Sequence, residues 1–349
     1  MSNKIRVLIV EDSLVVRELL KHIIGSDPRF DVVAAVESAE EGLSLLEVVE
    51  PDIISLDIRL PGMNGLDATL QIMAKRPTPI VVVAANVDDD ELNIAMNALR
   101  AGALAVVEKP VGVTNAAFEA MAHHLCTQLA IMSQVKVVRQ GIDRGLRFGT
   151  AEPPVVARRP AQGFSMVGIV SSTGGPQALV QLLSSLNAGF PLPILLVQHI
   201  TASFLEGFVS WLAGVTSFDV RIAQAGEVPE PGKVYVPPPD RHMVLKGGKL
   251  ALMDTPPLHS QRPSGSVLLS SLAKDVGRRA IGVVLTGMGS DGADGMAELH
   301  KAGGHTIAED ESTCVVYGMP AAAAKLGAVK DMLPLPGIAP RLAQLAGGK

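Results

Sequence analysis

Short apolar runs alternate with helical patterns along the first third of the chain. The runs are rich in Val, Ile and Leu, and the stretches between them repeat apolar residues at the spacing of one helix face. This alternation predicts five parallel strands with helices on both faces, a doubly wound α/β sheet. The expected strands are residues 5–10, 31–36, 52–56, 79–84 and 104–107.

The same alternation returns after Phe164 and predicts a second α/β domain with a mainly parallel sheet. A helical pattern runs over residues 116–138, and Gly, Pro and Arg dominate residues 141–163, where the apolar period is lost, as is typical of an exposed linker. We therefore predict a first domain over 1–125, a linker over 126–163 and a second domain over 164–345. The strands expected in the second domain are residues 166–170, 193–197, 233–236, 280–285 and 305–308.

Composition narrows the setting in which this chain works. With 349 residues it can form two cores, and with 3% aromatic residues those cores should be aliphatic. A net charge of −5 argues against a nucleic-acid partner. No apolar run is long enough to span a bilayer, and the charged Lys4 and Arg6 lead straight into a strand, so neither membrane insertion nor a secretory leader is expected. Cys126 and Cys314 form no metal or redox motif, which favours a reducing, cytoplasmic setting.

Charged residues follow three of the five strands expected in the first domain. Glu11 and Asp12 follow the first strand, Asp57 follows the third and Lys109 follows the fifth. Ligands of such sheets bind at the carboxyl ends of the strands, so these groups should converge. Carboxylates without His or Cys suit Mg²⁺, beside which one carboxylate can accept a phosphoryl group while the lysine balances the charge. A single acid there would more simply cap a helix; four such groups together favour the site.

A serine, a histidine and an aspartate follow three strands expected in the second domain. Ser172 lies in MVGIVSSTGGP, His199 in VQHI and Asp291 in TGMGSDG. Serine becomes a nucleophile when an imidazole takes its proton and a carboxylate orients that imidazole. The order Ser, His, Asp differs from the common hydrolase orders, which disfavours a standard α/β-hydrolase but leaves acyl transfer open.

Each member of this set has a rival. SSTGG could simply cap a helix or cradle a phosphate, and the glycine-rich GMGSDGADG could be a calcium-like loop, although it lacks the twelfth-position Glu. Ser172 is preferred because it adjoins the helix-opening Thr-Gly-Gly. The rival side chains are Ser171 as nucleophile, His242 and His305 as bases, and Asp294 as carboxylate.

Over roughly residues 4–125, the motifs VEDS, SLDIRLPGMNG and VEKP resemble the receiver domain of bacterial response regulators. The resemblance implies that Asp57 is the phosphoacceptor and that Lys109 contacts the phosphoryl group. It also implies that Glu11, Asp12 and Asp57 hold Mg²⁺ with help from the Arg59 carbonyl. Two positions depart from the pattern: Ala84 stands where receivers usually carry Ser or Thr, and Val106 where many carry an aromatic residue. We expect phosphorylation chemistry to be preserved and its conformational readout to be weakened.

Five further motifs, in order and behind this receiver, look like the family of chemotaxis response regulator protein-glutamate methylesterases, the CheB family. The resemblance implies Ser172 as nucleophile, His199 as general acid and base and Asp291 as its orienting carboxylate. Thr173 would help hold the histidine, and the Met288 backbone N–H would donate to the oxyanion. Ser290 stands where the best-known members have Asn. The motifs are SSTGGPQAL, VQHI, VPPPDRHM, LTGMGSDGADG and EDESTCVVYGMPAAA.

The resemblance also implies an activity and its control. The enzyme would hydrolyse γ-glutamyl methyl esters on methyl-accepting chemoreceptors and deamidate particular receptor glutamines, with no cofactor for the hydrolase. Its receiver would cover the active-site face until phosphoryl transfer from the histidine kinase of the chemotaxis array. The alternative is a phosphorylation-controlled receptor-binding module with a vestigial triad. A DNA-binding response regulator is disfavoured because no basic recognition helix follows the linker.

Overall fold

The computed structural model describes residues 4–85, 89–110, 115–135, 137, 163–186 and 189–347. The chain divides into two compact units, a first unit over residues 1–148 and a second unit over residues 149–349. Most of the predicted linker, residues 138–162, lies outside the described residues. In the described part of the chain, no helix combines the length and the apolar character that a bilayer crossing requires.

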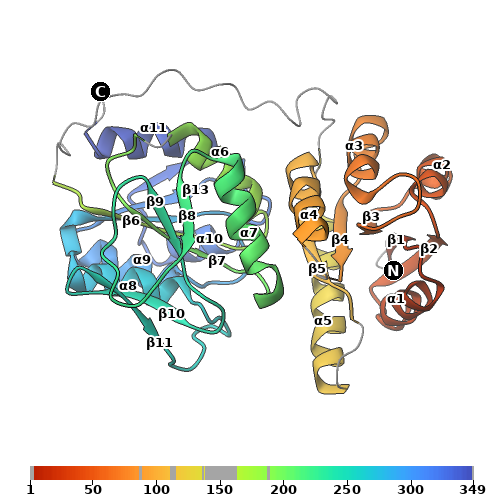
Figure 1. The fold of residues 1–349 in the computed structure, drawn as a ribbon, viewed down its shortest axis with the longest axis horizontal. Coiled ribbons are helices and arrows are strands. Elements are labelled where there is room, and N and C mark those ends of the chain that lie inside the picture. The colour runs from red at the N-terminus through yellow and green to blue at the C-terminus, as the bar shows by residue number, and fades with distance from the viewer. Residues whose placement is uncertain are drawn as a thin grey trace. The chain divides into compact units, whose positions relative to one another are not determined.

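The first unit is a five-stranded parallel sheet in the order β2-β1-β3-β4-β5. Helix α1 packs against α5, while α3 packs against α2 and α4 (Figure 1). The predicted doubly wound fold is confirmed here. The elements are β1 (Ile5–Val10), α1 (Leu14–Ser26), β2 (Phe30–Val36), α2 (Ala39–Val49), β3 (Ile53–Asp57), α3 (Gly65–Lys75), β4 (Ile80–Ala84), α4 (Asp89–Ala101), β5 (Ala105–Glu108) and α5 (Asn115–Met132).

Helix α5 extends beyond the position where the first domain was expected to end. The expected boundary at 125 falls inside the helix, which continues to Met132. Leu125, Leu129 and Met132 are all fully buried, so the last turns of α5 belong to the core of the first unit. Burial of one helix face keeps these last turns in place.

The second unit is a seven-stranded parallel sheet in the order β14-β13-β12-β6-β7-β9-β8. Helices α6 and α11 pack together, with α7 beside α6, and α8, α9 and α10 form a second group (Figure 1). The elements are β6 (Met166–Ser171), α6 (Gly175–Leu186), β7 (Ile194–Gln198), α7 (Ala202–Val215), β8 (Asp219–Ile222), β9 (Lys233–Val236), β10 (His242–Lys246), β11 (Lys249–Met253), α8 (Gly265–Asp275), a 3₁₀ turn (Gly277–Arg279), β12 (Ala280–Val284), α9 (Ala293–Lys301), β13 (His305–Glu309), α10 (Met319–Lys325), β14 (Asp331–Leu333) and α11 (Leu335–Leu345).

Four strands of the second unit were not predicted. Strands β8 and β14 form the two edges of the large sheet, and β10 and β11 form a separate antiparallel hairpin. Each carries exposed or partly exposed residues, so none shows the continuous apolar run that marks a strand buried on both faces. The five predicted strands form the interior of the sheet, where the candidate site lies.

Candidate active site and acidic rim

The central strands β6, β7 and β12 bring Ser172, His199 and Asp291 to one edge of the large sheet; we call these three residues the serine rim. Ser171 and Gln198 are paired at the ends of β6 and β7, so Ser172 and His199 each stand one residue beyond that pair. The Ser172 N–H donates to the Thr286 carbonyl at 3.1 Å. The turn after β12, which leads to Asp291, is therefore bound directly to the serine.

The His199 imidazole is hydrogen-bonded to Asp291, with 2.8 Å between His199 Nε2 and Asp291 Oδ2. Three further donors converge on the carboxylate from the start of α8: the Ser264 hydroxyl at 2.6 Å, and the backbone N–H groups of Gly265 at 2.6 Å and Ser266 at 3.0 Å. A helix N-terminus is a favourable place for a negative charge because its N–H groups have no partner within the helix. Asp291 is thus fixed in position and in charge.

The pKa of Asp291 reflects this balance. Burial acts to raise it, but the hydrogen bond and charge of His199, together with the bonds from Ser264 and Ser266, outweigh burial and hold the pKa of this carboxyl well below its usual range. Asp291 is consequently ionised at neutral pH. An ionised carboxylate can fix the tautomer of the imidazole and stabilise its protonated form.

The tautomer follows from this contact. Because Nε2 donates to Asp291, Nδ1 is the ring nitrogen that can accept the proton of a nucleophile. Within the described residues, no hydrogen bond joins the Ser172 hydroxyl to the imidazole. Catalytic hydrogen bonds often form only when substrate is bound, so the proximity of the two strand ends is the informative observation.

The turn after β12 lies against the serine. A Cβ built on Gly287 would lie 2.8 Å from Ser172 Cβ, which means that only glycine allows this approach. The backbone N–H of the next residue, Met288, has no hydrogen-bond partner in the described part of the chain. Thr173 contributes its carbonyl, which accepts from the Thr286 hydroxyl at 2.9 Å. The expected support of His199 by Thr173 stays a prediction, since no such bond occurs among the described residues.

The rival residues have other partners. The Ser171 hydroxyl is fully buried and donates to Gln198 at 2.7 Å. Asp294 is exposed and pairs with His259 at 2.8 Å. The ring nitrogens of His242 lie 3.1 Å from the Ser264 N–H and 3.2 Å from the Pro256 carbonyl, so both are engaged with the backbone. His305 begins β13, at the opposite end of the strand from the serine rim, and is bound to Asp331.

Two supports of this rim escaped sequence analysis. Ser264 and the first residues of α8 surround Asp291. The one sequence signal for this helix start is a serine, Ser264, that precedes an apolar run and can cap the helix. Glu309, fully buried at the end of β13, accepts from the Thr286 N–H at 2.8 Å and from the Thr313 hydroxyl at 3.0 Å. Burial raises the pKa of Glu309 more than these bonds lower it. This side chain links two of the loops that form the rim.

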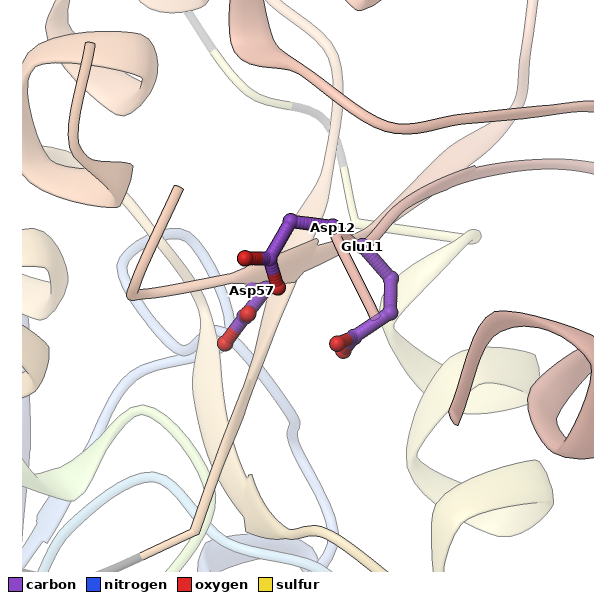
Figure 2. A group of neighbouring side chains, drawn as sticks. All are labelled: Glu11, Asp12 and Asp57. Carbon is purple, nitrogen blue, oxygen red and sulfur yellow. The ribbon is translucent and has the colours of Figure 1, made fainter. Parts of the chain in front are cut away.

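The first sheet gathers Glu11, Asp12, Asp57 and Lys109, which we call the acidic rim. Carboxylate oxygens of the three acids lie within 4.8 Å of one another, and Figure 2 shows the three carboxyl groups close together. Lys109 Nζ lies 2.9 Å from Glu11 Oε2 and 2.9 Å from Asp57 Oδ1. Sequence analysis had placed these four side chains at one edge, and the structure brings them together there.

Burial alters the charge state of two carboxyl groups of the acidic rim. Burial, followed by repulsion from Asp57, raises the pKa of Glu11 to about 7 despite the opposing effect of Lys109. Burial also raises the pKa of Asp57, and Asp57 Oδ2 is buried without a hydrogen-bond partner in the described residues. An unpaired buried oxygen beside two other carboxylates fits a small divalent cation with oxygen ligands. The role expected of the Arg59 carbonyl stays a prediction.

The fourth strand ends with Ala84, which is fully buried and accepts through its carbonyl from the Lys109 N–H at 2.9 Å. Its side chain offers no hydroxyl to a phosphoryl oxygen. The departure noted in the sequence therefore lies directly beside the lysine of the acidic rim.

Comparisons with known proteins give both units a family. The family model for CheB methylesterase matches residues 167–342, and the model for the response regulator receiver domain matches residues 7–117. A protein-glutamate methylesterase/protein-glutamine glutaminase of Paramagnetospirillum magneticum is 68% identical over 100% of this chain and 99% of its own length, and one of Nitrosospira multiformis is 42% identical over 98% and 97%.

A solved structure agrees with these matches. The CheB methylesterase catalytic domain of Thermotoga maritima is 36% identical, covers 52% of this chain and 98% of its own, and superposes with a TM-score of 0.51. The second unit thus has the fold of a known methylesterase catalytic domain, and the resemblance identified from the motifs is confirmed. With its receiver domain and its serine rim, the chain belongs to the CheB methylesterase family.

Proposed function

We propose that this chain hydrolyses γ-glutamyl methyl esters of chemoreceptors through Ser172, His199 and Asp291, and that its receiver controls the reaction. The observation that carries the proposal is the hydrogen bond between His199 and Asp291. His199 follows the end of β7, and Ser172 follows the end of the neighbouring strand β6. Relatives that match the full length are named protein-glutamate methylesterase/protein-glutamine glutaminase, which supports the substrate class.

In the first step, Ser172 Oγ attacks the ester carbonyl while His199 Nδ1 takes the hydroxyl proton. Asp291 stabilises the imidazolium that forms, because its low pKa keeps it ionised. The Met288 N–H, next to Gly287 against the Ser172 side chain, donates to the oxyanion. The imidazolium then gives its proton to the leaving methoxide, which departs as methanol.

In the second step, water attacks the acyl-enzyme while His199 takes its proton, and the glutamate side chain is released as Ser172 regains a hydrogen. The same steps with a glutamine release ammonia in place of methanol, which accounts for the second activity in the relatives' names. Neither step requires a metal or an organic cofactor.

The acidic rim serves as the control input. Asp57 accepts the phosphoryl group on a carboxylate oxygen, and Lys109, which lies 2.9 Å from Asp57 Oδ1, stabilises the new charge. Glu11, Asp12 and Asp57, with the Arg59 carbonyl, would hold Mg²⁺, which when bound neutralises the phosphoryl oxygens. The histidine kinase of the chemotaxis array is the phosphodonor that we infer, and the enzyme acts in the cytoplasm.

Replacing the nucleophile tests this proposal against the receptor-binding alternative. We expect Ser172→Ala to abolish methanol release from methylated receptor membranes while receptor binding persists. Ser185→Ala, on the exposed side of α6, is the matched control and should keep full activity. Unchanged methanol release by Ser172→Ala would eliminate the proposed nucleophile and, with retained binding, would favour a binding module.

The receiver's role is tested in the full-length chain. A small-molecule phosphodonor such as acetyl phosphate should accelerate methanol release in the presence of Mg²⁺, and Asp57→Asn should remove the acceleration because the acceptor oxygen is gone. If acceleration persisted in Asp57→Asn, the control input would lie elsewhere.

A further inference from the structure

The amide of Gln198 lies between the backbone segments that carry the nucleophile and the base. Its Nε2 donates to the Ser172 carbonyl at 2.9 Å and to the His199 carbonyl at 2.8 Å, while its Oε1 accepts from the Ser171 hydroxyl at 2.7 Å. Gln198 is only 3% exposed and Ser171 is fully buried. The bond from Ser171 is therefore buried and the two bonds from Nε2 are partly buried, and an unpaired polar group in such surroundings is costly.

The surroundings fix which way the amide points. Both backbone carbonyls can only accept, so the NH₂ group must face them, and a flipped amide would lose both of these bonds; the Ser171 hydroxyl then donates to the amide oxygen. Gly175, which begins α6, packs on the same group: a Cβ at this position would lie 2.0 Å from Gln198 Oε1 and 2.9 Å from Ser171 Cβ. Helix α6 thus starts on the amide itself, and a larger residue at 175 would displace it.

The sheet ladder does not fix these positions by itself. The last bond between the two strands runs from the His199 N–H to the Ser171 carbonyl at 3.0 Å, so Ser172 lies beyond the ladder. From there, the Ser172 carbonyl is held by the Gly175 N–H at 2.8 Å and by Gln198. Of these two bonds, only the one from Gln198 links the serine segment to the segment of His199.

We propose that Gln198, oriented by Ser171, is a positioning residue that sets the distance between the Ser172 nucleophile and the His199 base. The inference rests on the proposed function of those two residues. One planar NH₂ group bonded to both carbonyls keeps the two backbones at a fixed separation, and proton transfer between their side chains depends steeply on that separation. In this role Gln198 acts through the backbone carbonyls of Ser172 and His199.

Gln198→Met tests the role directly, because methionine has a similar length and packs in apolar surroundings but forms none of the three bonds. We expect kcat for methanol release to fall about tenfold to a hundredfold with KM changed less than about twofold, since a small misplacement of catalytic groups affects the reaction more than binding. Gln224→Glu, at an exposed position in the same unit, should keep wild-type kcat and KM.

Gln198→Glu adds a readout that a packing role would not change. A neutral carboxylic acid can donate to one of the two carbonyls, whereas the ionised form places a negative oxygen against both. The ratio of variant kcat to wild-type kcat should therefore fall as pH rises, and it can be measured within one folded protein even if Gln198→Met is unstable. Ser171→Ala leaves the amide oxygen without its donor and should lower kcat by a smaller factor than Gln198→Met does.

Four outcomes are distinguishable. A lowered kcat in Gln198→Met, with a pH-dependent ratio in Gln198→Glu, supports the inference. Wild-type kcat in both variants would overturn it, as would a loss in Gln198→Glu that is equal at every pH. Ser172→Ala, measured in parallel, reports on the proposed function itself: if that variant stayed active, the nucleophile would be misassigned, whatever Gln198 does.

Discussion

The two rims use the same position in the fold in opposite ways. Both lie at the carboxyl ends of parallel strands, where side chains from neighbouring strands converge. In the serine rim, four hydrogen bonds reach the carboxylate of Asp291 and lower its pKa despite burial. In the acidic rim, burial and repulsion from Asp57 outweigh the effect of Lys109 and raise the pKa of Glu11 to about 7. One oxygen of Asp57 also has no hydrogen-bond partner among the described residues.

The difference separates a carboxylate that the chain surrounds with hydrogen-bond donors from carboxylates that it leaves partly without them. Donors around Asp291 are provided by the backbone and by Ser264, so the serine rim is organised before substrate arrives. Glu11 and Asp57 share Lys109, and a cation or a phosphoryl group would change the charge balance around them. A catalytic site benefits from fixed charge, whereas a control site benefits from charge that can be altered.

The largest effect should come from neutralising the organised carboxylate. We expect Asp291→Asn to lower kcat for methanol release by about 10³–10⁴-fold, because an amide cannot stabilise the imidazolium and favours the wrong tautomer. Asp294→Asn, three residues further along the chain and exposed, is the matched control and should change kcat little. Equal losses in the two variants would contradict the assignment of the orienting carboxylate.

The next effect concerns the acidic rim. Since the pKa of Glu11 is raised to about 7, this group binds a proton at pH 6 that a divalent cation must displace. Mg²⁺ affinity should therefore be about tenfold weaker at pH 6 than at pH 8. Calorimetric titration with Mg²⁺ measures this, and Glu11→Gln should remove most of the dependence. An affinity independent of pH would mean that the rim is already ionised without metal.

Without metal, the stability of the folded protein should also depend on Glu11, but it should fall as pH rises, whereas Mg²⁺ affinity increases. A carboxyl whose pKa is higher in the folded state than in the unfolded state contributes stability at low pH and loses it as pH rises through the folded value. Added Mg²⁺ should consequently raise the Tm of the first unit more at pH 8 than at pH 6. A larger Tm shift at pH 6 would contradict the pKa of Glu11.

A smaller effect is expected at Ala84. A hydroxyl beside Lys109 would give the phosphorylated state a contact that the unphosphorylated state lacks, and only such differential contacts shift a conformational equilibrium. Ala84→Ser should increase the stimulation of methanol release by a phosphodonor roughly fivefold. Ala85→Ser, at the adjacent position, serves as the control. Equal stimulation of wild type and Ala84→Ser would make the missing hydroxyl irrelevant to signalling.

The smallest effect should be that of Glu309→Gln. Burial raises the pKa of Glu309, so its charged form costs stability as pH rises through the folded value, whereas the amide carries no charge. We expect wild type and Glu309→Gln to differ by less than about 1 kcal/mol in free energy of unfolding at pH 5. At pH 8 the variant should be more stable relative to wild type than it is at pH 5. Glu309→Ala, which removes the acceptor of the Thr286 N–H, should instead destabilise at both values.

Sequence patterns predicted the interior strands and the residues at their ends, because strands buried on both faces show continuous apolar runs. Strand β8 escaped prediction since it lies at an edge and begins with the exposed Asp219. The roles of Ser264 and Gln198 escaped for another reason. Each acts through hydrogen bonds with residues 26 or 27 positions away, and nothing in the local sequence encodes such contacts.

The buried end of α5 decides where the two halves of this protein can be separated. A receiver fragment that ended at residue 125 would lack Leu129 and Met132, whose side chains have no exposed surface in the first unit. Such a fragment would expose apolar surface and fray the remaining helix, and its tendency to aggregate could be mistaken for a property of the receiver. Ending the fragment at Val135 retains the whole helix and gives phosphorylation assays an intact domain.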